Sequence, residues 1–207
     1  MGHLQQLIYR RLLEQPAWRD AVFAALPADV RAAADLNIAA TADLRPRSAV
    51  RITTLPYWTI VQPPPIDELL RYYKEAESQF GVPWYYLASI HLVETRMGRI
   101  HGNSYAGAQG PMQFMPATWA IYGRGDINDP HDAILAAARY LRAAGAPGNM
   151  FRAIYAYNHD NSYVDAVIKY AEVMRLDPNA YRGFYGWQVY FITATDEVLL
   201  PVGYSKQ

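Results

Sequence analysis

The sequence contains no cysteine among its 207 residues. This absence excludes a disulfide scaffold, thiolate chemistry and cysteine-ligated zinc sites. The sequence also lacks an excess of charge of either sign, because 19 lysines and arginines balance 19 aspartates and glutamates. Proteins that bind nucleic acids usually carry a basic excess, so we expect no nucleic-acid partner. The longest apolar runs are too short to cross a membrane, so we expect no membrane span.

The chain is instead rich in apolar and aromatic residues. Hydrophobic residues make up 52%, which is enough for the packed core of one domain with extensions. The 17 tyrosines and 5 tryptophans suit a sugar-binding groove, although a core uses such residues too. The opening Met1-Gly2-His3 is typical of an added start. We therefore expect the mature part of a longer protein from which an export signal has been removed.

The N-terminal part of the chain divides into two segments. Residues 1–44 have helical spacing that Pro16 and Pro27 interrupt, which predicts an N-terminal helical extension of two or three short helices. Residues 45–65 are rich in proline, which predicts a stiff linker that runs along the surface of the next domain.

The remaining sequence predicts a helical domain over residues 66–176 and a C-terminal extension over residues 177–207. The extension contains two β-rich runs around residues 194–197, which predict a β-hairpin. The fold class is therefore mainly α. Within the helical domain, Gly81 is expected to end one helix, and Pro83 is expected to take the first position of the next.

Three further helix ends can be predicted from local signals. The helix that Pro83 opens is expected to close at Gly98. Asp129 precedes Pro130 in the pattern of an N-cap. Ser162 is followed three residues later by an acid, which predicts an acidic variant of the capping box.

Glu94 lies on an apolar helix, where Leu87, Ile90 and Glu94 share one face at i, i+3 and i+7. Burial disfavours the charged carboxylate, and so does the negative end of the helix dipole, so both raise its pKa. A glutamate that stays protonated near neutral pH can act as a general acid. The alternative is a buried glutamate that pairs with Arg96, Arg99 or a histidine.

The loop after this helix, HGNSYAGAQGPMQF, combines glycines with amides and a hydroxyl. Glycines let a backbone approach a ligand closely, and amides and hydroxyls recognise neutral polar groups such as sugar hydroxyls and acetamides. Ser104, Gln109 and Gln113 are therefore candidate substrate-binding residues, although a turn-rich connection would have a similar composition.

No second acid stands in this neighbourhood, since the next acidic residue after Glu94 is Asp126. Asp126 and Asp129 suit helix capping better than catalysis. Most glycoside hydrolases use two carboxylates. A single acid favours a reaction whose nucleophile belongs to the substrate, because no water then needs a separate base.

Three motifs occur in order: ETRMG, GAQGPMQFMPATW and AIYAYN. They resemble the successive motifs of the lysozyme-like (SLT-type) lytic transglycosylases that cleave bacterial peptidoglycan. The resemblance covers about residues 66–175, and the last 30 residues are like the tail of actinobacterial members. It implies a lysozyme-like helical domain, an extracytoplasmic location at the cell wall and peptidoglycan glycan strands as the partner. We further expect a monomer.

The resemblance also assigns roles to individual residues. Glu94 matches the catalytic acid that later acts as the base, and Tyr157 matches a tyrosine that hydrogen-bonds this glutamate. Thr95 stands where the family more often has serine, which implies a hydroxyl near the scissile sugar. Met112 and Gln113 match a loop that lines the sugar site, where Pro111 replaces the usual leucine. Asn158, next to Tyr157, completes the expected substrate-binding set.

The implied reaction fits the single acid. Glu94 protonates the glycosidic oxygen between N-acetylmuramic acid and N-acetylglucosamine, and the 2-acetamido group stabilises the anomeric carbon. The glutamate then removes the proton of the muramoyl C6 hydroxyl, which attacks C1 and forms a 1,6-anhydro sugar. No cofactor takes part.

Three alternatives remain at this point. A goose-type lysozyme would use water as the nucleophile, and a catalytically silent wall-binding module would bind without cleavage. A metal site could begin from His91 and Glu94, which are i, i+3 on one helix. Such a pair is a weak signal without further ligands on facing helices, so we expect no metal.

Overall fold

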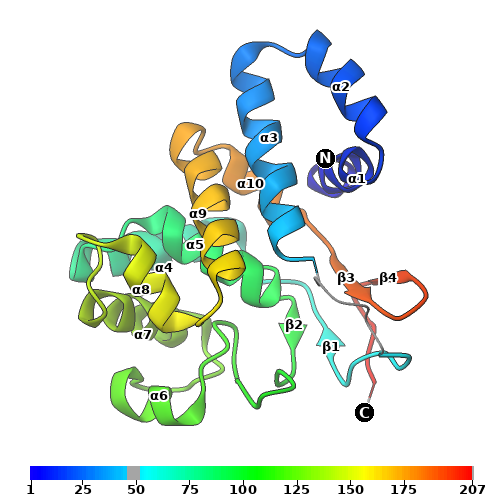
Figure 1. The fold of residues 1–207 in the computed structure, drawn as a ribbon. Coiled ribbons are helices and arrows are strands. Elements are labelled where there is room, and N and C mark those ends of the chain that lie inside the picture. The colour runs from blue at the N-terminus through cyan, green and yellow to red at the C-terminus, as the bar shows by residue number, and fades with distance from the viewer. Residues whose placement is uncertain (46–51, 207) are drawn as a thin grey trace.

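The computed structural model describes residues 1–45 and 52–206, and most of these residues are helical (Figure 1). Its helices are α1 (Gly2–Glu14), α2 (Pro16–Ala25), α3 (Ala28–Asp43), α4 (Ile66–Phe80), α5 (Trp84–Thr95), α6 (Pro116–Tyr122), α7 (Pro130–Ala143), α8 (Met150–Tyr157), α9 (Asn161–Leu176) and α10 (Ala180–Tyr185). Its strands are β1 (Thr59–Ile60), β2 (Ile100–His101), β3 (Val189–Ile192) and β4 (Glu197–Leu200). The predicted mainly α fold class is confirmed.

The N-terminal segment folds as the predicted short helices. Pro16 occupies the first turn of α2, where its missing N–H costs no hydrogen bond, and Pro27 is the N-cap of α3. The helix α3 packs against α9, so the N-terminal helices stand on the helical body (Figure 1). The division of the whole chain into four segments stays a prediction.

The helical body surrounds α5, which is apolar on nearly every side. Leu87, Ile90 and Leu92 are completely buried, and α4, α7 and α9 pack around this helix. Gly81 ends α4 in the left-handed conformation, as predicted. The prediction for Pro83 was wrong by one position, because it is the N-cap of α5 and Trp84 is the first helical residue.

The segment predicted to be a linker is partly built into the body. Residues 46–51 lie outside the described residues. Beyond them, β1 pairs antiparallel with β2, which comes shortly after the end of α5. Thr59 also forms a β-bridge with Ser205 near the C-terminus. Backbone pairing thus holds residues 59–60 against the body.

The C-terminal segment contains the predicted hairpin, in which β3 pairs antiparallel with β4. The short helix α10 before it was not predicted. Trp187 connects the two, and its ring packs edge-on against Tyr170 of α9 and Phe184 of α10. The hairpin residues Val189 and Leu200 form a small apolar cluster with Ile60. Burial therefore connects the tail to both the body and the N-terminal half.

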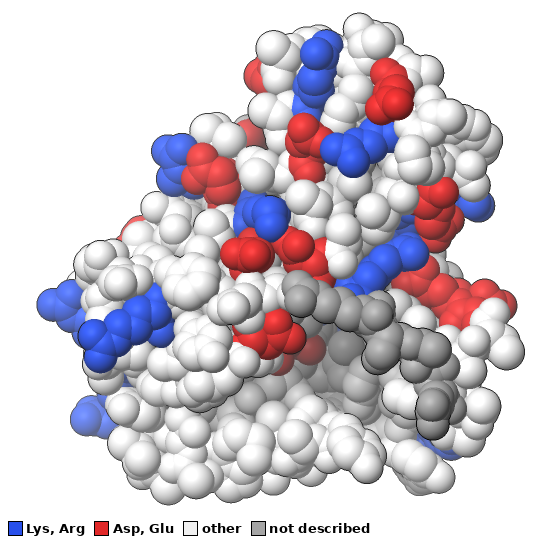
Figure 2. All heavy atoms as spheres, viewed as in Figure 1, with Lys and Arg blue, Asp and Glu red and all other residues white. Residues whose placement is uncertain are grey.

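The capping predictions were partly confirmed. The side chain of Asp129 accepts a hydrogen bond from the Asp132 backbone N–H, as expected for the N-cap of α7. The capping box at Ser162 was wrong, because Asp160 caps α9 by accepting from the Ser162 N–H. No helix in the described ranges is long and apolar enough to cross a membrane. Figure 2 shows acidic and basic side chains interspersed on one face of the molecule.

Candidate active site

Glu94 is the second-last residue of α5, directly before an unusual turn. Arg96, Met97 and Gly98 all have positive φ values, of 55°, 61° and 85°. The left-handed conformation costs an L-residue roughly 1–2 kcal/mol, and such strain is commonly found at functional sites. The predicted helix end at Gly98 was therefore too late, because α5 stops at Thr95 and the chain reverses over the next three residues.

The Glu94 carboxyl is largely buried and is held by a tyrosine. The Tyr163 hydroxyl donates to Oε1 over 2.5 Å. Burial raises the pKa of Glu94 to about 7, although the hydrogen bond from Tyr163 acts in the opposite direction. A carboxyl group in this state is half protonated near neutral pH. It can therefore donate a proton and afterwards take one back.

The predicted ion-pair alternative is wrong for this glutamate. Arg96 donates to the Leu92 carbonyl, and Arg99 donates to the Tyr185 carbonyl. His91 is completely buried and shares a hydrogen bond with the Tyr73 hydroxyl. None of these three groups pairs with the Glu94 carboxyl in the described ranges.

The prediction that Tyr157 hydrogen-bonds Glu94 was also wrong. The Tyr157 hydroxyl donates to the backbone carbonyl of Met112 over 2.6 Å. Tyr157 is the last residue of α8, and its ring packs against Phe114. The first turn of α9 carries Tyr163, and α9 packs along α5, so the hydroxyl of Tyr163 reaches the carboxyl. Tyr157 instead supports the loop beside the site.

Thr95 connects the end of α5 to that loop. Its hydroxyl donates to the Pro111 carbonyl over 2.6 Å and accepts from the Gly98 N–H over 3.1 Å. The side chain is completely buried. Thr95 thus positions the loop, and its hydroxyl is already engaged within the protein.

The loop residues predicted to bind substrate mostly shape the loop itself. Gln113 has a φ of 51°, and its Nε2 donates to the Gly110 carbonyl over 2.8 Å. Met112 is completely buried. Ser104 accepts from the Ala108 N–H within a tight turn. Gln109 forms a backbone bridge with Phe114, and its amide has no side-chain hydrogen bond within the part of the chain that the structure describes.

Two cavities lie beside residues that hydrogen-bond to Glu94 and Thr95, although neither Glu94 nor Thr95 lines these cavities itself. The first, of about 360 Å³, is here called the candidate cleft, and it is lined by Asp43, Leu44, Arg45, Asn158, Asp160, Ser162 and Tyr163. The second, of about 150 Å³, lies beside the loop and is lined by Ile100, His101, Gly102, Asn103, Gly110, Pro111 and Asn128. Tyr163 connects the first cavity to Glu94, and Pro111 connects the second to Thr95.

A comparison with known families identifies the domain that contains these residues. The family model of the transglycosylase SLT domain matches residues 71–174, which is half of the chain and includes α5, the loop and α8. The chain belongs to the transglycosylase SLT domain family. This membership confirms the predicted resemblance to the SLT-type family.

One curated relative of this SLT domain is membrane-bound lytic murein transglycosylase F of Thiobacillus denitrificans. It is 24% identical over 153 residues, which cover 70% of this chain and 32% of the relative. The chain thus spans about a third of that relative's length. Solved structures of the Escherichia coli lytic transglycosylase SLT35, with calcium and with bulgecin A, have a TM-score of 0.46 at 19% identity. The matched region covers 54% of this chain and 74% of the SLT35 chain.

Sequence reasoning missed the residues that reach the SLT site from a distance. Asp43, Leu44 and Arg45 line the candidate cleft, although they belong to the segment predicted to be an extension or to its border with the linker. Tyr163 lies six residues after Tyr157 of the AYN motif, and its place on the first turn of the next helix is the one signal that could have suggested it. Asn158 is the predicted substrate-binding residue that does line the candidate cleft.

The carboxylates of two residues, Asp43 and Asp160, line the candidate cleft, and both already have partners. Asp160 caps α9, and Asp43 pairs with Lys169. The acids first considered in the sequence lie in the turn before α7, where Asp129 caps the helix and Asp126 accepts from the Asn128 N–H. The structure therefore brings two acids to the cleft wall that the sequence order did not indicate.

The described residues contain one group of three potential metal ligands, namely Asp129, His131 and Asp132. The two aspartates accept hydrogen bonds from backbone N–H groups, and His131 contacts Glu75. His91 and Glu94 are not part of such a group, so the metal hypothesis for this pair finds no third ligand among those residues.

Proposed function

We propose that this chain is a peptidoglycan lytic transglycosylase that cleaves the β-1,4 bond between N-acetylmuramic acid and N-acetylglucosamine. Glu94 acts as the only acid and base, and the product carries a 1,6-anhydro-N-acetylmuramic acid end. The enzyme is a lyase acting on a glycosidic bond. The observation that carries this proposal is the Glu94 carboxyl with a pKa of about 7, held by Tyr163 beside a cleft in an SLT domain.

In the first half-step the protonated Glu94 donates its proton to the glycosidic oxygen. Breaking the bond leaves positive charge on the anomeric carbon, which the substrate's own 2-acetamido group stabilises. In the second half-step the Glu94 carboxylate accepts the proton of the C6 hydroxyl, whose oxygen closes the anhydro ring. A group with a pKa near neutrality serves both half-steps well, because both protonation states are readily populated.

The residues around Glu94 support this cycle through position. Tyr163 donates to the carboxyl and stabilises its charged form between the two half-steps. Thr95 and Tyr157 hold the loop at Pro111 and Met112. Asn158 lines the cleft with an amide suited to sugar hydroxyls and acetamides. Because peptidoglycan lies outside the cytoplasmic membrane, we propose an extracytoplasmic location for the enzyme. We also propose that it acts as a monomer.

A second candidate is a hydrolase like the goose-type lysozymes, in which water takes the place of the C6 hydroxyl. Asp43 and Asp160 in the cleft wall favour it, because a second carboxylate can activate water. Both are occupied by structural partners, which favours the transglycosylase. Mass spectrometry of fragments released from purified sacculi separates the two reactions. Anhydro ends support the proposal, whereas reducing ends, heavier by one water, would refute it.

The same experiment tests whether the chain is a catalytically silent wall-binding module, because such a module would release no fragments. A cosedimentation assay with sacculi provides the control, because it detects binding without cleavage. Retention of the Glu94 carboxyl in a buried position beside a strained turn speaks against a module without activity, since binding alone does not require it.

A further inference from the structure

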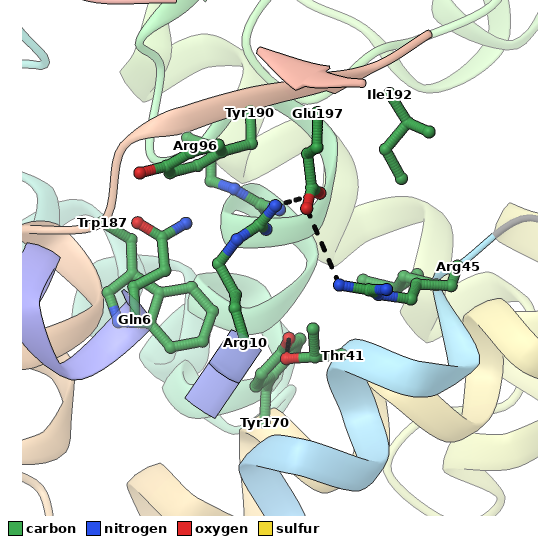
Figure 3. A pocket seen from close by; sticks show the side chains of 11 residues that line it. Gln6, Arg10, Thr41, Arg45, Arg96, Tyr170, Trp187, Tyr190, Ile192 and Glu197 are labelled. Carbon is green, nitrogen blue, oxygen red and sulfur yellow. Dashed lines mark hydrogen bonds and ion pairs between the residues drawn. The ribbon is translucent and has the colours of Figure 1, made fainter. Parts of the chain in front are cut away.

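A cavity at the junction of α1, α3, α5, α9 and the C-terminal hairpin contains an unusual concentration of guanidinium groups. It encloses about 130 Å³, room for a small polar group, and we call it the arginine pocket. Its charged lining consists of Arg10, Arg45, Arg96 and Glu197. Figure 3 shows the side chains of Arg10 and Arg45 reaching Glu197 from two sides, with Arg96 beside them.

Two of the three arginines have carboxylate partners. Arg10 forms an ion pair with Glu197. Arg45 pairs with Glu14 over 3.0 Å and lies 3.6 Å from Glu197. The proximity of the cations is unfavourable, because burial first and then the neighbouring Arg45 and Arg96 lower the pKa of Arg10 to about 10.

Arg96 is the cation without an acidic partner among the described residues. Its Nη1 donates a hydrogen bond to the Leu92 carbonyl over 2.6 Å. Burial lowers the pKa of its guanidinium. The sequence of residues 46–51, which the structure does not describe, contains no acidic residue. A largely buried guanidinium is costly unless an anion compensates it. Three arginines, Arg10, Arg45 and Arg96, face two carboxylates, Glu197 and Glu14, so this group of side chains has one positive charge in excess.

Capping of α5 accounts for only part of this arrangement. The bond to Leu92 satisfies one carbonyl at the end of the helix, where a cation is also favoured by the helix dipole. A guanidinium has five N–H donors in a planar fork that matches a carboxylate. The remaining donors of Arg96 have no hydrogen-bond acceptor within the described chain, and the side chain lines the pocket.

The arginine pocket adjoins the candidate cleft. Leu44 and Arg45 line both cavities, so these two residues form a wall that the cavities share. A glycan strand in the cleft carries peptide stems on its muramoyl residues, and these stems bear free carboxylates. A stem that leaves the cleft past Leu44 would bring a carboxylate to Arg96.

We propose that the arginine pocket binds a carboxylate of the peptide stem of the glycan strand, with Arg96 as its main partner. This inference rests on the proposed peptidoglycan substrate. It makes Arg96 a specificity-determining residue that lies two positions beyond the catalytic glutamate. The enzyme is accordingly expected to prefer strands that carry their stems over strands from which an amidase has removed them.

The test compares the release of anhydro-ended fragments from both substrates, with and without stems, for the full chain and its variants. In Arg96→Gln we expect the ratio of the two rates to fall about ten- to hundred-fold, the usual worth of a hydrogen bond to a charged group. Because Glu94 catalyses cleavage of both substrates, a general effect of the substitution on Glu94 changes both rates equally and leaves their ratio unchanged. Arg182→Gln is the matched control, because Arg182 is an exposed arginine paired with Asp67 outside the pocket lining. An unchanged ratio in Arg96→Gln would overturn the proposal.

A binding measurement separates this inference from the proposed function. Isothermal titration with the free stem peptide, and with the same peptide after amidation of its carboxyls, needs no catalysis. We expect binding of the free peptide, its loss on amidation and a weakening in Arg96→Gln, with Arg96→Lys in between. Equal binding of both peptides, or acetate binding as tightly as the peptide, would refute the stem assignment. A wild type that binds the peptide but releases no fragments would instead contradict the proposed function alone.

Discussion

Replacing Glu94 with glutamine should abolish activity and, at the same time, stabilise the folded protein above neutral pH. The amide keeps the shape of the side chain but cannot deliver or accept a proton. General acid and base groups are each worth about 10²–10⁴-fold, and here one residue performs both steps. We therefore expect no detectable anhydro-muropeptide release, with glycan binding retained.

The stability effect follows from the pKa. Burial raises the Glu94 pKa from 4.5 to about 7, so the folded state binds the proton more tightly than the unfolded state. The stabilisation from protonation is fully present at a pH below the pKa of Glu94 in the unfolded state. It is lost as the pH rises through the pKa of Glu94 in the folded state. The difference between 4.5 and about 7, at 1.36 kcal/mol per pKa unit, corresponds to about 3 kcal/mol. Glutamine does not titrate and escapes this loss.

Urea unfolding of the wild type and Glu94→Gln between about pH 4 and pH 8 measures the effect. The free energy of unfolding of the variant relative to the wild type should rise by about 3 kcal/mol across this range. Glu172→Gln is a suitable control, because hydrogen bonding to Arg175 lowers the Glu172 pKa and its removal acts with the opposite sign. A pH-independent difference for Glu94→Gln would refute the assignment of a buried, titrating acid.

Further predictions concern the groups around the glutamate. Tyr163→Phe removes a hydrogen bond that lowers the glutamate pKa, so turnover should fall roughly 10- to 1,000-fold and the basic limb of the pH–rate profile should move to higher pH. Tyr157→Phe should lower turnover without moving that limb, because the Tyr157 hydroxyl bonds the Met112 carbonyl and not Glu94. Identical pH profiles for the two variants would contradict the assignment of different hydrogen-bond partners to the two tyrosines. Thr95→Ser should keep the hydrogen bond to the Pro111 carbonyl, whereas Thr95→Val leaves that carbonyl unpaired. Thr95→Val should therefore lower the free energy of unfolding in urea by about 1–3 kcal/mol. Equal stability of the two variants would be inconsistent with this role of the Thr95 hydroxyl. Truncation after Asp177 removes the ring packing of Trp187 and should lower the melting temperature and increase binding of a hydrophobic dye, and an unchanged melting temperature would show the tail to be independent.

The sequence alone determined most of the local structure. Proline and glycine positions identified the breaks between α1, α2 and α3 and the end of α4, because these residues restrict or extend the backbone by themselves. The apolar pattern around Glu94 identified a buried acid with a raised pKa, because a helix that is apolar on nearly every side and too short to span a membrane lies in a core. The ordered motifs identified the family, because they keep their spacing along the chain.

The tertiary structure alone decided which side chains meet. Two tyrosines, Tyr157 and Tyr163, lie six residues apart on different helices, and only the packing of α9 along α5 determines that Tyr163 reaches Glu94. Whether the Thr95 hydroxyl faces a sugar or the Pro111 carbonyl depends on the reversal of the chain after α5. Neither contact can be obtained from periodicity, since both depend on the relative placement of separate elements.

The same reason explains the contribution of the N-terminal helices. Asp43 and Arg45 are more than 40 residues away from Glu94 in the sequence, yet they line the cleft and the arginine pocket because α3 packs on α9. Helical spacing predicted a helical extension over residues 1–44, and that segment carries no motif that would connect it with the site. Local sequence determines the helices and the acid, whereas the surface complementarity between helices determines the walls of the cleft and the charges that face it.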